Sequence, residues 1–419
     1  MLFTAGNSLV SGGFLLFFAR EFGATGVWIA VLSMLPETAG TFGLATRWIV
    51  RRFGGRRRAV WIACSLAARG TSLGIPLLAL PDVRPDGLSP LLLIAACLVL
   101  SHALQAIAYV AYLSWLTDLV PETNWGRLFA KRNIAQTVVL LVLPVASGYL
   151  QDAARGVSPA AALLVYAATY GIGVLLMIAS LLPLLPLPDV PVRPAAPGGS
   201  GWPVLRDAWR NRPLRFLLIH NWWLAFANGL TQAAFFSFSA GTLGVGRATY
   251  YLLSGAMQLT MIPVSWWAGS ACDRSGSRGP LVWGVLVASC GLLFWLAATP
   301  ERWWLLFGAY VLWGGFAAAN IAGRNLLFTL APRSDNSAHL ALFQQIAGLL
   351  AGLSGLLGGL WLDALRESGF ALHWLGLEFG SFQLLFAVSL VGRLSSLVWL
   401  FPVDETAHEC DRAPRSQES

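Results

Sequence analysis

Charged side chains are scarce in this chain of 419 residues. Only 11% of its residues are Asp, Glu, Lys or Arg, whereas an ordinary soluble chain carries roughly 25%. Because 56% of the residues are hydrophobic, a soluble fold of this size could not bury so much apolar surface. The composition therefore excludes an ordinary soluble protein and indicates a membrane protein.

The chain also lacks the short motifs of common enzymes and metal sites. It has no HExxH zinc motif, no Walker phosphate loop and no CxxC pair. We therefore expect no cofactor, no metal and no enzymatic activity. Its scattered cysteines predict neither a disulfide framework nor a metal site; they are Cys64, Cys97, Cys272, Cys290 and Cys410.

What the chain has instead is a series of apolar runs of about 17 to 28 residues. Each can cross roughly 30 Å of hydrocarbon as a helix, which satisfies its own backbone hydrogen bonds in lipid. The first run has no basic leader or small-residue cleavage site, so we expect a true span and not a removed signal peptide. The predicted spans are residues 1–19, 26–46, 59–80, 90–116, 129–150, 160–186, 214–239, 249–271, 280–299, 303–330, 340–362 and 381–401.

The net charge of +8 does not indicate nucleic-acid binding, because the basic residues lie in short loops beside the spans. Basic loops of membrane proteins stay on the cytoplasmic side. Every second loop is therefore predicted to be cytoplasmic, together with both termini, in a multi-pass protein of the cell membrane. The basic residues concerned are Arg51, Arg52, Arg56, Arg57, Arg58, Arg127, Lys131, Arg132, Arg206, Arg210, Arg212, Arg215, Arg274 and Arg278.

A single long polar interruption divides the chain into residues 1–186 and 214–402, leaving a tail at 403–419. Residues 187–213 are rich in proline and glycine and predict a flexible cytoplasmic linker. The two halves repeat each other: Gly148 and Asp152 correspond to Gly359 and Asp363, each 211 positions later (148 to 359, 152 to 363). We therefore expect an all-α protein of twelve transmembrane helices in two pseudo-symmetric six-helix bundles, with a substrate site between them.

A loop after the eighth predicted span carries a family resemblance. Gly269, Asp273, Arg274, Gly276 and Arg278 form a GxxxDRxGxR pattern. In a chain with this predicted topology, the pattern resembles the signature loop of the major facilitator superfamily. The resemblance implies a secondary active transporter that moves a small organic solute by alternating access, as a monomer surrounded by membrane lipids.

The resemblance also implies that such loops latch against the opposite half when the cytoplasmic side is closed. Asp273 would face Arg127, and Arg51 or Arg52, which replace the acidic residue of the family's pattern, would meet Asp335. A purely structural role is the alternative for these residues. The full set of predicted gating residues is Arg51, Arg52, Asp118, Arg127, Asp273, Arg274, Arg278 and Asp335.

Polar residues three, four or seven positions apart fall on one face of several predicted spans. In the family these spans line the central cavity, so the resemblance places substrate contacts there. Hydrogen bonding between helices is the alternative role. The predicted cavity residues are Asn7, Ser11, His102, Gln105, Tyr109, Tyr112, Asn221, Asn228, Gln232, Trp313, Asn320 and Arg324.

Among the acidic residues, only Glu37 lies deep within a predicted span. A carboxyl group at that depth can load and unload a proton, so Glu37 is a candidate for proton coupling, with His102 the next candidate. A structural role for Glu37, paired with an arginine, is the alternative. Arg69 and Arg393, in spans that are peripheral in the family, are predicted to be structural.

The same sequence is compatible with other functions. A lipid flippase or scramblase could use the same fold, and so could a receptor that transports nothing. A membrane-embedded enzyme is disfavoured, because one buried carboxylate cannot supply an acid and base pair.

Overall fold

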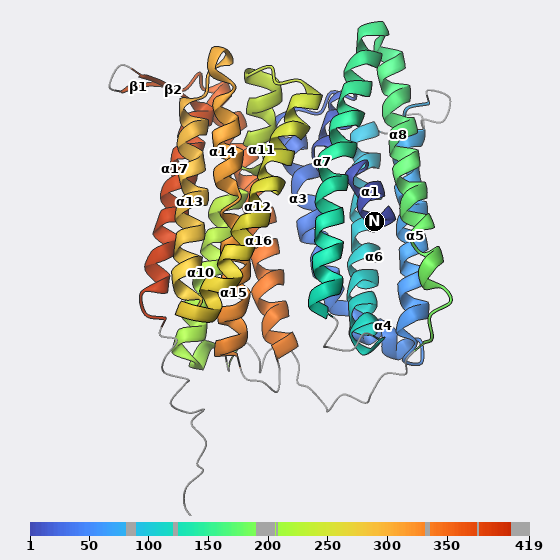
Figure 1. The fold of residues 1–419 in the computed structure, drawn as a ribbon. Helices are drawn as coiled ribbons and strands as arrows, with labels where there is room; N and C mark the ends of the chain where they lie inside the picture. Colours follow the sequence, from blue (N-terminus) through green and yellow to red (C-terminus); the bar gives the residue numbers. More distant parts are fainter. Residues whose placement is uncertain are drawn as a thin grey trace, which may run out of the picture.

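The structure, a computed structural model, describes residues 1–80, 89–119, 125–189, 206, 208–331, 336–374 and 377–403. It is a bundle of long, roughly parallel helices (Figure 1). Ten helical segments in the described part of the chain are long and apolar enough to cross a membrane. The protein is therefore a multi-pass membrane protein.

The first half of the bundle begins with a broken span. Helices α1 (Leu2–Ser8) and α2 (Gly13–Arg20) are separated at Gly12, whose φ of 59° lies in the left-handed region. The remaining elements are α3 (Gly26–Ala39) with the 3₁₀ turn η1 (Gly40–Ala45), α4 (Thr46–Arg52), α5 (Arg57–Leu77), α6 (Pro90–Leu119), α7 (Trp125–Val157) and α8 (Pro159–Ala179) with η4 (Leu182–Leu184).

The second half has the same order of helices. Its elements are α10 (Arg212–Gly229), α11 (Gln232–Phe236) with the π-helical η5 (Ser237–Thr242), α12 (Arg247–Ser275), α13 (Arg278–Ala297), η6 (Pro300–Arg302), α14 (Leu305–Trp313), α15 (Phe316–Leu330), α16 (Asn336–Glu367), β1 (Ala371–Trp374), β2 (Leu377–Gly380), α17 (Ser381–Ser396) and η8 (Leu397–Leu400).

Each predicted span falls on one of these helices or on a broken pair of them. Two predicted spans are not among the ten apolar segments: the seventh, on α10 and α11, and the eighth, on α12. Their Asn, His, Trp and Tyr residues lower mean hydropathy, although aromatic rings bury much apolar surface. The antiparallel hairpin β1–β2 was not predicted. Most of the predicted linker, at 190–205 and 207, and the tail at 404–419 lie outside the described residues.

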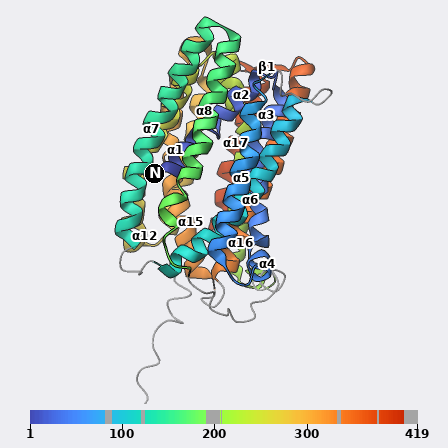
Figure 2. The same ribbon diagram turned by 90° about the vertical axis from the view of Figure 1, so that its right-hand side faces the viewer.

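The bundle has two ends, named here for what they carry. The hairpin end carries β1, β2 and the turn between α7 and α8, and the α4 end lies opposite (Figure 1). Between the halves, α3 packs along α16 and α7 packs along α12, whereas α5 with α6 and α7 with α8 pack within the first half (Figure 2).

Glycines bring the paired helices of the two halves together. A Cβ atom on Gly148 of α7 would lie 2.8 Å from the Ala248 backbone of α12. A Cβ atom on the corresponding Gly359 of α16 would lie 2.4 Å from the Cβ of Ala30 in α3. Since real Cβ contacts are longer, both helix pairs need a residue without a side chain. The duplicated sequence therefore makes the same contact twice.

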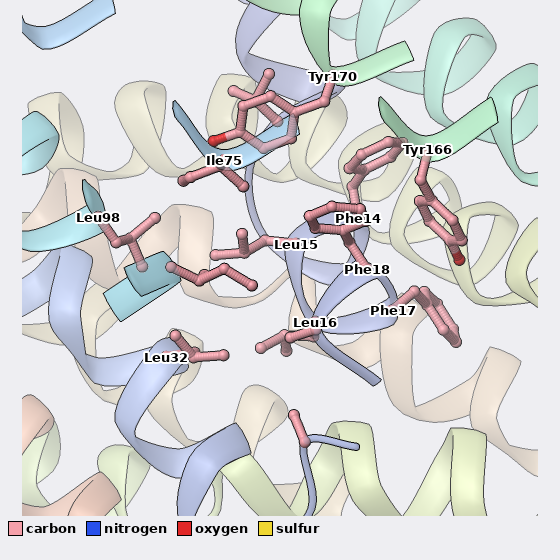
Figure 3. Packing of buried hydrophobic residues seen from close by; sticks show 14 of the residues in the cluster. Phe14, Leu15, Leu16, Phe17, Phe18, Leu32, Ile75, Leu98, Tyr166 and Tyr170 are labelled. Atoms are coloured by element: carbon pink, nitrogen blue, oxygen red, sulfur yellow. The ribbon is translucent and has the colours of Figure 1, made fainter. Parts of the chain in front are cut away.

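An aromatic core also joins the halves near the hairpin end. The ring of Phe17 in α2 lies 4.8 Å from Phe236 and 5.6 Å from Tyr250, both of the second half. Phe14 packs edge-on against Tyr166 of α8 at 5.3 Å (Figure 3). This packed cluster crosses the boundary between the halves and closes the bundle there.

These contacts predict that Gly148→Ala destabilises the protein. The added methyl group overlaps the backbone of α12, and overpacking of this kind costs about 1–3 kcal/mol. Gly156→Ala in the same helix is the matched control, because nothing lies within 4 Å of its Cβ position. Thermal unfolding in detergent should show a lower midpoint for Gly148→Ala only. Equal midpoints for the two variants would contradict the close contact.

Candidate functional site

A cavity of about 840 Å³ lies between the halves. Its walls come from α3 and α6 of the first half and from α10, α11, α13, α15 and α16 of the second. The lining residues of α13 and α16 belong to the parts of those helices nearer the α4 end, and those of α10 run from Leu217 to Gly229. The cavity therefore extends from the α4 side of the bundle to the start of α11.

Seven residues predicted from the sequence line this cavity. They share polar side chains and come from five helices, α3, α6, α10, α11 and α15. They are Glu37, Tyr109, Asn221, Asn228, Gln232, Asn320 and Arg324. His220 and Gln344 line it as well and were not predicted.

The apolar part of the wall comes mainly from the second half. Phe316, Phe328 and Phe343, with Leu217 and Leu224, line the same cavity as the amides. Ligand sites in proteins are typically concave and mostly apolar, with a few convergent polar groups, and measure roughly 300–1,000 Å³. The cavity has the size and the chemistry of a site for a small organic molecule.

Glu37 supplies the carboxyl group and Arg324 the guanidinium group among the described lining residues. Both side chains are exposed to the cavity. Within the described part of the chain neither takes part in an ion pair or a side-chain hydrogen bond. The alternative role for Glu37, a structural carboxylate paired with an arginine, is thus not seen among the described residues.

The other polar residues of the first half lie in a separate, smaller cavity. Asn7, Ser11, His102 and Gln105 line a space of about 40 Å³ inside that half. There Arg69 donates hydrogen bonds to the Gln105 side chain and, at 3.1 Å, to the Ser65 carbonyl oxygen. Arg69 thus binds the polar face of α6, as expected for a structural arginine, and keeps Gln105 from the main cavity.

A third cavity of about 160 Å³ adjoins both spaces. It shares Ser11 and His102 with the small cavity and Gln232 with the main one. His102 therefore lies within the bundle behind the main cavity and not on its wall.

Two predicted cavity residues lie elsewhere. Tyr112 packs beside Trp61 at 5.5 Å and lines a cavity of about 380 Å³ within the first half. Trp313 is buried against Trp295, with ring centroids 5.6 Å apart. The helix is interrupted between α14 and α15, so the seven-residue spacing from Trp313 to Asn320 does not keep both on one face.

An ion network that was not predicted holds the hairpin end. The Arg247 guanidinium lies 2.9 Å from Asp152 and 2.8 Å from Glu21, and it also donates to the Tyr166 hydroxyl. Arg155 extends the network with a 2.6 Å contact to Glu21. Since Arg247 belongs to the second half and its partners to the first, the network joins the halves.

The two repeated aspartates each contact the start of a helix in the opposite half. Asp363 of α16 accepts a hydrogen bond from the Val27 amide of α3 at 2.9 Å. Asp152 of α7 accepts one from the Ala248 amide of α12 at 3.4 Å. A carboxylate at a helix N-terminus binds free N–H groups and interacts favourably with the helix dipole. The motif repeat noted in the sequence therefore marks two equivalent interhelical clamps.

No contact of this kind is seen for the described side chains of Asp273, Arg274, Arg51 and Arg52 in the predicted gating loops. Asp273 is exposed, and Arg274 donates to the Ser270 carbonyl oxygen of its own helix at 3.0 Å. Arg51 and Arg52 are exposed at the end of α4. Arg278 donates to the Phe401 carbonyl oxygen at 3.3 Å. The side chains of Asp118 and Arg127, and all of Asp335, lie outside what the structure describes.

Among the described residues no group of three or more His, Cys, Asp or Glu side chains is placed to hold a metal ion. The expectation that the protein has no metal site and no cofactor remains a prediction.

The ion network predicts unequal effects for its two arginines. Arg247→Gln leaves two carboxylates without their buried partner, and loss of a buried partner costs about 3 kcal/mol. Arg155, whose side chain is 56% exposed, should contribute less than about 1 kcal/mol. Alkylation of a cysteine placed at buried Ala24, in a variant without native cysteines, should accelerate in Arg247→Gln and not in Arg155→Gln. Equal rates in both would mean that the network does not close this end.

Comparisons with known proteins show which fold this is. No family model and no curated protein matches the sequence. Among solved structures, a point mutant of nucleoside transporter NupG is similar with a TM-score of 0.66 and 14% identity, over 96% of this chain and 98% of that one.

Two further similar structures are transporters as well. An inward-facing bacterial homologue of the iron transporter ferroportin has a TM-score of 0.67 at 13% identity, over 95% of each chain. A POT family transporter in complex with 5-aminolevulinic acid has a TM-score of 0.66 at 12% identity, over 95% of this chain and 94% of that one. The chain therefore has the major facilitator fold that the sequence predicted.

Proposed function

We propose that this chain is a secondary active transporter that moves a small organic solute across the cell membrane by alternating access. The main support is the 840 Å³ cavity, which both halves line with polar side chains. The aromatic core and the ion network close its hairpin side. The structure then corresponds to the state that is open at the α4 end.

The α4 end is the cytoplasmic one in this proposal. Arg51 and Arg52 end α4, and Arg274 and Arg278 lie between α12 and α13 at the same end. Basic residues beside membrane spans favour the cytoplasmic side. The cavity would then face the cytoplasm, and the C-terminal end of η8 would lie on that side, whereas the chain's N-terminal end lies partway along the bundle (Figure 1).

The gating loops would act in the opposite state. In the state open toward the hairpin end, the loop that carries Asp273 would contact the first half near Arg127. Arg51 or Arg52 would contact Asp335. The exposed side chains of Asp273, Arg51 and Arg52 are free to do so in the present state.

The proposed solute contacts are those that line the main cavity. Tyr109 is the member of the α6 stripe that remains on the wall, while Asn221, Asn228 and Gln232 project from the opposite half. The similar structures are a nucleoside transporter, a homologue of an iron transporter and a POT family transporter. The size of the cavity supports a small solute. Since one chain supplies the whole described wall, we propose that the protein acts as a monomer.

Other functions have less support. A lipid flippase needs a polar groove that faces the membrane, whereas the main cavity lies between the halves. An enzyme needs a reactive constellation, and Glu37 is the one carboxyl group among the described lining residues. A receptor of the same fold would bind a solute without exchanging it.

The proposed orientation predicts which cysteines can be labelled from outside the cell. In a variant without native cysteines, Ser368→Cys at the hairpin end should react with a membrane-impermeant maleimide on intact cells. Arg52→Cys at the α4 end should react only after the membrane is permeabilised. Both positions are exposed on the protein, so a difference in labelling would report the side of the membrane and not burial of the side chain. The reverse pattern would overturn the orientation.

Coupling to protons is proposed to depend on Glu37. A carboxylate that faces a wet cavity can ionise in one state and hold a proton in another, so protonation biases which side is open. Glu37→Gln should therefore abolish uphill transport driven by a pH gradient in proteoliposomes and preserve counterflow exchange. Exposed Glu367→Gln is the control and should retain both activities. Uphill accumulation by Glu37→Gln would place the proton site elsewhere, with His102 the next candidate.

A further inference from the structure

The charges on the cavity wall come one from each half. Glu37 lies near the end of α3, and Arg324 lies in α15. The other polar lining groups are phenol, amide and imidazole groups. The imidazole belongs to His220, whose Nδ1 lies 2.8 Å from the Ser396 carbonyl oxygen and is thus engaged by the backbone of the second half.

Neither charge has a partner among the residues that the structure describes. By contrast, Arg247 forms ion pairs with two carboxylates, and Arg69 donates hydrogen bonds to two acceptors. Glu37 and Arg324 have no such partner within the described part of the chain. A charged side chain at membrane depth costs a few kcal/mol and is normally paired or in water. Two unsatisfied charges of opposite sign therefore face one wet cavity.

The rest of the wall limits the solute further. Phe316, Phe328 and Phe343 supply apolar surface, and Asn228 and Asn320 supply donors and acceptors. An ion with no apolar body would leave the aromatic wall uncovered, and an uncharged apolar molecule would displace water from both charges without replacing its hydrogen bonds.

We propose, on the basis of the proposed transport function, that the cavity takes a zwitterionic solute with an apolar body, in the class of amino acids and short peptides. Its ammonium group faces Glu37 and its carboxylate faces Arg324. A pure cation would leave Arg324 without a partner, and a pure anion would leave Glu37 without one. Rejection of such solutes follows from the unpaired charge that remains.

The proposal also assigns Glu37 two alternative occupants. One carboxylate can hold a proton or face an ammonium group, but not both at full strength. Acidification should therefore weaken solute binding, because protonation removes the charge that attracts the ammonium group. The other titratable or charged groups that face the cavity are Tyr109, His220 and Arg324, with His102 in the adjoining space.

Four ligands of one molecular shape test the charge requirement. Leucyl-phenylalanine carries both charges, its methyl ester only the positive one, and its N-acetyl derivative only the negative one. The N-acetyl methyl ester carries neither. Binding to the purified full-length protein is measured by isothermal titration at pH 6 to 7. The dipeptide should bind about tenfold or more tightly than each derivative, the scale expected for a lost charged hydrogen bond.

Two variants assign each charge to its partner. Glu37→Gln should abolish the preference for the dipeptide over its N-acetyl derivative and retain the preference over the methyl ester. Arg324→Gln should do the opposite. Arg366→Gln and Glu367→Gln, at exposed positions away from the cavity wall, should retain both preferences. Because each preference is a ratio measured within one variant, a change in the fraction of folded protein does not affect it.

The outcomes separate this inference from the transport proposal. Equal affinity for all four ligands, or unchanged preferences in both variants, would overturn the zwitterion assignment. If none of the four binds and a solute of another class exchanges by counterflow, transport stands and the assignment is wrong. If no solute of a broad library binds or exchanges, the transport proposal itself fails.

Discussion

Close contact between two pairs of helices, α3 with α16 and α7 with α12, determines where everything else in the structure lies. Glycine removes the side chain at each contact, and an aspartate one turn farther along binds the start of the opposing helix. Since these contacts are near the hairpin end, the proposed motion separates the halves toward the α4 end. The polar cavity lies between the halves.

Features that depend on local periodicity, such as the helices and their polar faces, could be predicted from the sequence. A long apolar run must be a helix in lipid, so the spans were found although α10 and α12 carry many aromatic and amide residues. Residues three or four positions apart share a face, which placed Asn228 and Gln232 on one wall. Depth in the membrane singled out Glu37. The repeat of Asp152 at Asp363 was visible, but its role was not, because a repeat does not show what each copy contacts.

What the sequence could not show depends on neighbours that are distant along the chain. Periodicity gives the face of a helix and not its partner, so Gln105 was assigned to the cavity although Arg69 of α5 holds it inside the first half. The network around Arg247 joins residues 95 and 226 positions apart. Trp313 was misplaced because the pattern assumed an unbroken helix.

The two aspartate clamps are equivalent in position but not in chemistry. Asp363 acts alone on the start of α3, whereas Asp152 shares its helix start with Arg247, Glu21 and the exposed Arg155. Dissolved ions screen exposed charges beyond about 8 Å at physiological ionic strength and reach buried contacts much less. Salt therefore screens the exposed Arg155 at the rim of the α7–α12 seam and reaches the buried contact of Arg247 with Glu21 much less. Opening that seam breaks ion pairs, whereas opening the opposite seam breaks a contact between one carboxylate and a helix amide.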